Sequence, residues 1–186
     1  MDMDTSGRSP KQAAVQDSAG ARVPSIAFAA DGCIIALWQK LLIVVWATAG
    51  TGPLVAELAR ISDGLHNVYP KMSSIHIIVE GAGMPTEDAR RGLSLLGSRF
   101  AERLACVATL IEAGGFWASA MRALVVSLQA VDRRPYKTRT FATRRELAAW
   151  VSPIHTAEVG EPCDAVELEA ALAWVCAQPQ ARLNRA

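Results

Sequence analysis

The sequence lacks both an apolar run long enough to cross a membrane and a strong excess of either charge. Its most apolar segment, residues 33–50, is interrupted by Gln39 and Lys40, whereas a membrane-spanning helix needs about 20 predominantly apolar residues. Lys and Arg number 19 and Asp and Glu number 18, so the net charge is +1. A transmembrane segment is therefore not expected, and binding of nucleic acid through overall charge is not favoured.

Metal-ligand spacings and catalytic motifs are also missing. The cysteines lie far apart without a CxxC pair, and the histidines show no ligand spacing; these residues are Cys33, Cys106, Cys163, Cys176, His66, His76 and His155. No GxSxG, GxGxxG or GxxxxGK[ST] sequence occurs, so neither a nucleophile elbow nor a phosphate-binding loop is indicated. The expectation is a chain without a metal site, a cofactor or catalytic residues.

The first 24 residues lack the apolar core of a secretory signal. They are rich in Ser, Gly, Ala, Pro and Asp, a composition typical of a disordered tail. With neither a signal nor a membrane span predicted, a cytoplasmic location is expected.

Apolar residues are nevertheless abundant, at 51% of the chain, with a mean hydropathy of +0.20. They first gather in three short runs, IAFAA, CIIALW and LLIVVWAT, within residues 26–48. Either Asp31-Gly32 or Gln39-Lys40 can form the turn of a tight hairpin between these runs. Asp-Gly is the better turn dipeptide, but the pattern leaves the choice open.

Helical and strand patterns then alternate. An amphipathic helix is predicted over residues 54–68, buried strands over 74–80 and 105–113, and a further strand over 136–143. Helices are expected after Thr86, after Gly115 and over residues 144–151. Strands that alternate with helices imply right-handed crossovers, so the predicted fold is α/β, with a mixed, mostly parallel sheet of about five strands.

The chain is divided by this pattern into a tail (1–24), a domain (25–152) and an appendage (153–186). A linker of about ten residues is expected after Pro153, followed by an amphipathic helix whose apolar stripe contains Leu168, Leu172 and Val175. Such a helix can pack on the domain or dock on another protein, and the sequence leaves both open.

Three segments carry a family resemblance. They are IIALWQKLLIVVW, the strand-turn-helix IEAGGFWASAMRALVVSL, and Pro135-Tyr136 leading to Phe141-Ala142-Thr143. Residues 25–152 resemble the STAS-like proteins, the group of sulfate-transporter and anti-sigma-factor-antagonist domains, and in particular the stand-alone bacterial type. The resemblance implies a phosphorylatable Ser or Thr at the start of the second main helix, where this chain has Thr86 in the sequence EGAGMPTED.

Thr86 is therefore the first candidate site. A phosphate at a helix N-terminus meets free N–H groups and a favourable dipole. The alternative is a plain N-cap, in which the Thr hydroxyl accepts one of those N–H groups. Glu87 and Asp88 favour the cap, because an added phosphate would be repelled by their charges.

The strand ends supply the second candidate. Glu80 and Glu112 each end a predicted strand, and ligands of open α/β sheets favour the crevice beyond the carboxyl ends of strands. Two carboxylates there could do acid–base work, and Gly114-Gly115 before a helix could hold an anion. The structural alternative is a tight turn that permits close packing of helix on sheet.

A basic surface is expected around the last strand, formed by Arg133, Arg134, Lys137, Arg139, Arg144 and Arg145. It could bind an acidic partner, or it could protect an edge strand from aberrant pairing. The acidic residues that follow, from Glu158 to Glu169, could fold back on it.

These observations predict a non-enzymatic STAS-like regulatory or protein-interaction module with an unidentified protein partner. The alternative is a domain, or a small enzyme, that binds a small ligand, lipid or anion at the crevice near Glu80 and Glu112. The sequence leaves the oligomeric state open.

Overall fold

Three strands open the described part of the chain, and helices and strands alternate from α1 to α4, as the sequence patterns predict. The structure, a computed structural model, describes residues 23–112, 114–130 and 135–179. The elements are β1 (Ser25–Ala30), β2 (Cys33–Trp38), β3 (Leu41–Trp46), α1 (Gly52–Val68), β4 (Met72–Val79), α2 (Glu87–Arg99), β5 (Leu104–Glu112), α3 (Gly115–Ala130), β6 (Lys137–Phe141), α4 (Arg144–Val159) and α5 (Ala165–Cys176). Nearly all of the expected tail lies outside the described residues.

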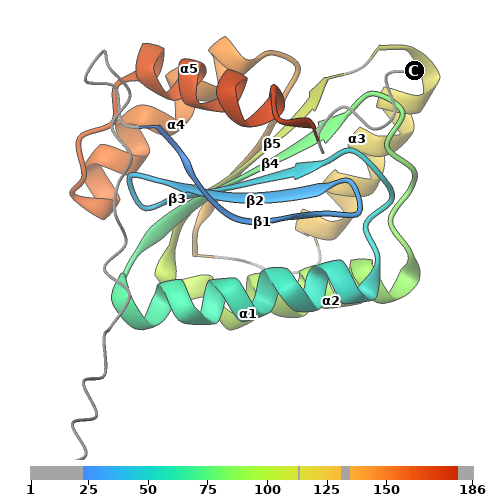
Figure 1. The fold of residues 1–186 in the computed structure, drawn as a ribbon, viewed down its shortest axis with the longest axis horizontal. Coiled ribbons are helices and arrows are strands. Elements are labelled where there is room, and N and C mark those ends of the chain that lie inside the picture. Colours follow the sequence, from blue (N-terminus) through green and yellow to red (C-terminus); the bar gives the residue numbers. More distant parts are fainter. Residues whose placement is uncertain (1–22, 113, 131–134, 180–186) are drawn as a thin grey trace, which may run out of the picture.

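The strands form one mixed sheet in the order β1-β2-β3-β4-β5-β6, with β1 and β6 at the edges. β2 pairs antiparallel with both β1 and β3, and β3 to β6 pair in parallel. Helices α1 and α2 lie on one side of the sheet and α4 and α5 on the other (Figure 1). Helix α3 packs on the α1/α2 face, against Ile78 and Ile111. Across the described residues, no helix is long and apolar enough to cross a membrane.

Both candidate turn dipeptides form turns, which is why the sheet has six strands rather than about five. Asp31 and Gly32 have φ values of 50° and 72°, and Gln39 and Lys40 have 47° and 59°. Positive φ at both central residues is the requirement of a type I′ turn, whose twist matches that of the flanking strands. Asp-Gly meets this requirement at low cost, whereas Gln and Lys must be held in it by the rest of the fold.

Contacts with distant residues hold the Gln39-Lys40 turn. His155 of α4 is fully buried, and its Nε2 lies 2.8 Å from the carbonyl oxygen of Gln39 while its Nδ1 lies 2.9 Å from Ser73 Oγ. Since a carbonyl only accepts, Nε2 donates to it and Nδ1 accepts from the Ser73 hydroxyl. The Lys40 ammonium also pairs with Glu161 at 2.9 Å. The backbone conformation of the turn is thus fixed by residues more than 110 positions away.

The first part of the segment expected to be a linker after Pro153 is helix, and only residues 160–164 connect α4 to α5 without helical structure. Helix α4 runs from Arg144 to Val159 and ends at Gly160, whose φ is 72°. A proline inside a helix removes one backbone hydrogen bond, the one to the carbonyl four residues earlier. Pro153 and Ala149 are both exposed, so water can satisfy the carbonyl that the proline leaves free, and the helix continues.

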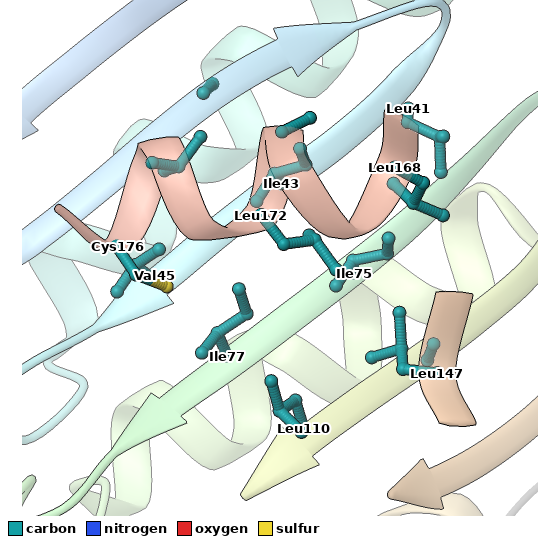
Figure 2. Packing of buried hydrophobic residues seen from close by; sticks show 14 of the residues in the cluster. Leu41, Ile43, Val45, Ile75, Ile77, Leu110, Leu147, Leu168, Leu172 and Cys176 are labelled. Atoms are coloured by element: carbon teal, nitrogen blue, oxygen red, sulfur yellow. The ribbon is translucent and has the colours of Figure 1, made fainter. Parts of the chain in front are cut away.

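The C-terminal helix is part of the core. Its apolar stripe, with Leu168, Leu172 and Val175 fully buried, belongs to the same hydrophobic cluster as the strands. Helix α5 packs over β2 and β3, and Figure 2 shows Leu172 between Ile43 of β3 and Ile75 of the neighbouring β4. Of the two alternatives for this helix, the structure shows packing on the chain's own sheet.

We expect Leu172→Ala to lower the free energy of unfolding by about 2–5 kcal/mol, because it removes a fully buried side chain and leaves a cavity. Val166→Ala on the same helix is the control, since Val166 is 75% exposed, and should change stability by less than about 0.5 kcal/mol. Urea unfolding of the full chain measures both. Equal effects of the two substitutions would contradict the packing of α5 on the sheet.

Candidate functional site

A cavity of about 160 Å³ lies between the sheet and the α1/α2/α3 layer. Its floor is the amino-terminal half of β4 and β5, and its walls are the carboxyl-terminal halves of α1 and α2. The lining is mainly apolar, with Leu58, Leu93, Leu96 and Val107 among its members. This is the opposite end of the parallel strands from Glu80 and Glu112.

The cavity exists because small side chains occupy positions where large ones would fill the space. Helix α1 contributes Ser62, helix α2 contributes Ser94 and Gly97, and the strands contribute Ser74 and Thr109. Protein interiors normally pack to the density of organic crystals, with few voids larger than a water molecule. Small residues from four different elements that meet at one place therefore mark a hollow built into the fold.

His76 forms part of the cavity floor and is held as a neutral ring. Trp46 Nε1 donates to its Nδ1 at 3.3 Å, and its Nε2 lies 3.2 Å from Ser74 Oγ. Because the indole N–H is only a donor, Nδ1 is the acceptor and Nε2 carries the proton. Burial lowers the pKa of His76 from 6.5 to about 4. The floor is therefore polar but uncharged at neutral pH.

His66 lies at the mouth of the cavity, beside a polar cleft. The ring stacks on Phe100 with the centroids 4.2 Å apart, and the residue is only 7% exposed. Its Nδ1 is buried without a hydrogen-bond partner among the described residues. Burial is the main cause that lowers the pKa of His66, so this ring is also neutral at pH 7.

A polar cleft of about 260 Å³ adjoins the cavity and shares His66 and Phe100 with it. Asp63, Arg99 and Arg103 line this cleft. Arg99 pairs with Asp63 at 2.8 Å, and Arg103 Nη1 donates to the carbonyl oxygen of His66 at 3.1 Å. These two arginines and one aspartate form what we call the rim.

Thr86 caps helix α2. Its Oγ1 accepts the backbone N–H of Ala89 at 3.3 Å, and Glu87 and Asp88 occupy the first helical turn. The geometry is that of a plain N-cap. Phosphorylation of the exposed Thr86 hydroxyl stays a prediction.

The strand-end residues lie in different surroundings, although Glu80 directly follows Val79, the register partner of Glu112. Glu112 is paired with Arg144 of α4 at 2.5 Å, and Glu80 is exposed after the end of β4. Gly114 and Gly115 are also exposed. A side chain at Gly115 would meet nothing within 4 Å, so close packing is not the reason for glycine there. Its φ of 70° is the reason, because that conformation favours glycine.

The expected basic surface is distributed along an edge strand. Lys137 and Arg139 are exposed on β6, and the Arg139 guanidinium lies 5.3 Å from the ring centre of Phe141. Arg145 is exposed on α4 while Arg144 is engaged with Glu112. Arg133 and Arg134 lie outside the described residues. Cations on an exposed edge strand oppose pairing with another chain.

The acidic segment after Pro153 does turn back on lysines. Glu158 lies 2.7 Å from Lys71 and 4.0 Å from Lys137 of β6, and Glu161 pairs with Lys40. The hydrogen bond from Lys71 is the main cause that holds the pKa of Glu158 below its usual range. The acidic residues therefore connect α4 and the loop after it to the starts of β3, β4 and β6.

Sequence reasoning placed His66 in a helix and His76 in the core, but it did not join them in one site and did not single out Arg99 or Arg103. A signal was present in β4, where Ser74 and His76 alternate with isoleucines. Alternation places both polar side chains on one face of the sheet. No such local signal connects that face to the rim, because α2 is brought there by tertiary packing.

Comparison of the chain with protein-family models, curated proteins and solved structures found no match. Within residues 23–112, 114–130 and 135–179, no three His, Cys, Asp or Glu side chains gather where they could hold a metal ion. Function must therefore be argued from the cavity and its surroundings.

We expect Thr86→Ala to lower the free energy of unfolding by about 1 kcal/mol, because the Ala89 N–H loses its side-chain acceptor. Thr86→Asp should restore most of this stability, since Asp is also a good N-cap. Thermal unfolding measures both variants. A Thr86→Ala protein as stable as the wild type would show that the cap contributes nothing.

A second prediction concerns pH. The folded-state pKa of His76 is depressed from 6.5 to about 4, so the unfolded chain binds one more proton between these values. The resulting stability is complete above pH 6.5 and is lost as the pH falls, at about 1.4 kcal/mol per pH unit. Urea unfolding at about pH 7 and about pH 5 should show a shallower fall for His76→Gln, whose amide oxygen can still accept from Trp46. Equal slopes for variant and wild type would contradict the buried neutral state.

Proposed function

We propose that this chain is a non-enzymatic, small-ligand-binding regulatory domain whose ligand occupies the cavity beneath α1 and α2. The observation that carries the proposal is the cavity itself, a mainly apolar hollow with a few polar groups on its floor. Ligand sites of globular proteins have this character: apolar walls supply affinity, and a few placed polar groups supply orientation.

The chemistry of the buried groups supports binding over catalysis. His76 has both ring nitrogens engaged and a pKa of about 4, so it is a poor general base at neutral pH. Burial raises the pKa of Cys33 to about 12 and that of Cys106 to about 11, which keeps these thiols protonated and unreactive. Glu112, a candidate acid or base, is bound to Arg144.

The regulatory role and the protein partner come from the STAS-like resemblance, and both stay predictions. A ligand in the cavity would contact α1, α2 and the sheet together, because all three line it. Binding would therefore stabilise the packing of this helical layer. A partner that contacts the outer surface of α1 or α2 could bind with a different affinity once the packing of these helices is stabilised.

The proposal is tested with benzene as a neutral probe. At about five times its Kd, a probe that binds only the folded chain raises the free energy of unfolding by about 1 kcal/mol. We expect this rise for the wild type, measured by urea unfolding in sealed cells. Ser94→Leu should abolish the rise, because the larger side chain fills the cavity from α2.

Ser98→Leu is the matched control, being the same substitution one turn further along α2 at an exposed position. It should leave the benzene effect intact. Val107→Phe, which fills the cavity from the floor instead, provides a second blocking variant if Ser94→Leu folds poorly. A wild type that benzene does not stabilise, or a benzene effect that survives both filling variants, would refute the proposed function.

A further inference from the structure

We infer that the ligand is a small amphipathic anion, with an apolar body about the size of one aromatic ring, a polar hydrogen beside His66 and a carboxylate or similar group at the rim. This inference rests on the proposed function and adds the chemical class of the ligand. Four features of the site support it: its size, its partnerless His66 nitrogen, its charge and its neutral floor.

The size of the cavity limits the apolar body. Its volume is about 160 Å³, and an apolar protein cavity of about 150 Å³ is known to accept benzene. A single six-membered ring or a short branched chain therefore fits, whereas a long acyl chain does not. The adjoining cleft of about 260 Å³ leaves room for a polar group outside the apolar hollow.

The His66 nitrogen points to a polar group on the ligand at the junction of the two spaces. Nδ1 is buried and has no hydrogen-bond partner among the described residues, although the residue lines both the cavity and the cleft. A buried polar atom left unpaired costs about 1–3 kcal/mol. The neutral ring donates its one N–H to the backbone of Tyr69, so Nδ1 is an acceptor. A polar hydrogen of the ligand placed here would donate to Nδ1 and remove that cost.

The charge of the rim selects an anion. Arg99 and Arg103 both line the cleft, and Asp63 is the carboxylate that faces them there. Asp63 is engaged with Arg99, whereas the bond that Arg103 makes is to an uncharged carbonyl. One positive charge at the cleft is therefore not neutralised by its lining residues, and a carboxylate that emerges from the cavity would meet it beside His66.

The uncharged floor of the cavity determines the orientation of the bound ligand. His76 is neutral, and its partners Ser74 and Trp46 are uncharged, so nothing at that end stabilises a buried charge. An ion placed there would lose its hydration without a counter-charge, which is costly. The anionic group must therefore face the rim, and the ring must face the floor.

The experiment compares three probes of one shape, benzoate, benzyl alcohol and benzylamine, by isothermal titration calorimetry on the full chain. We expect benzoate to bind about tenfold more tightly than benzyl alcohol, because charge-assisted hydrogen bonds are about twice as strong as neutral ones. Benzylamine should bind more weakly than either. Arg103→Gln should reduce the affinity for benzoate about tenfold and leave that for benzyl alcohol unchanged.

Arg99→Gln is the second rim variant, and it should weaken benzoate binding further because it also frees Asp63. Arg91→Gln on the same helix is the matched control, since Arg91 is exposed, pairs with its helix neighbour Glu87 and lines neither the cavity nor the cleft. Benzoate binding should not change.

The outcomes separate the two proposals. Equal affinities for benzoate and benzyl alcohol, both lost in Ser94→Leu, would overturn the anionic class and leave the proposed function standing. Benzoate binding that survives Ser94→Leu, or that Arg91→Gln weakens as much as Arg103→Gln does, would also overturn the inference. Failure of every probe to bind, benzene included, would overturn both.

Discussion

The alternation of side chains along β4 is the constraint on which the rest of the structure depends. Ile75 and Ile77 point to the α4/α5 face and Ser74 and His76 to the α1/α2 face, because successive residues of a strand face opposite sides of the sheet. The parallel register places apolar neighbours beside the isoleucines, Ile43 next to Ile75 among them. These isoleucines therefore join the larger hydrophobic cluster, and Ser74 and His76 present polar groups to the cavity on the other face. A slip of one residue in this register would exchange the two faces.

Local patterns were sufficient to predict the α/β class, the parallel central strands and most elements, because period and turn chemistry are properties of short segments. They were insufficient where distant residues decide the local conformation. The Gln39-Lys40 turn is held by His155, which no nearby pattern indicates. Pro153 ended a helix in the prediction, yet α4 continues through it on its exposed side. In both places tertiary contacts or solvent exposure outweigh the intrinsic preference.

The candidate site was less predictable than the fold for a related reason. One alternative from the sequence was a ligand crevice at the carboxyl ends of the strands, where open sheets usually bind ligands. Glu112 there pairs with Arg144, and that alternative stays a prediction. The cavity lies at the opposite end because small residues on α1 and α2 leave space above the strands. A small residue on a helix gives no sequence signal of a cavity by itself, since its meaning depends on what faces it. Only the packed structure brings Ser62, Ser94 and Ser74 together.

The two faces of the sheet differ in packing, and the proposed ligand site lies on the less densely packed one. The α4/α5 face contains the larger cluster of fully buried side chains, and the pairs Lys71–Glu158 and Lys40–Glu161 connect α4 and the loop after it to strand starts. Glu158 and Glu161, two of the acidic residues of the C-terminal region, therefore form ion pairs that connect elements on this face. The α1/α2 face can then tolerate a hollow, a neutral buried histidine and an unpaired ring nitrogen, each of which costs stability. Such costs persist in a fold only where the remaining structure compensates for them, and binding of a ligand would recover part of them.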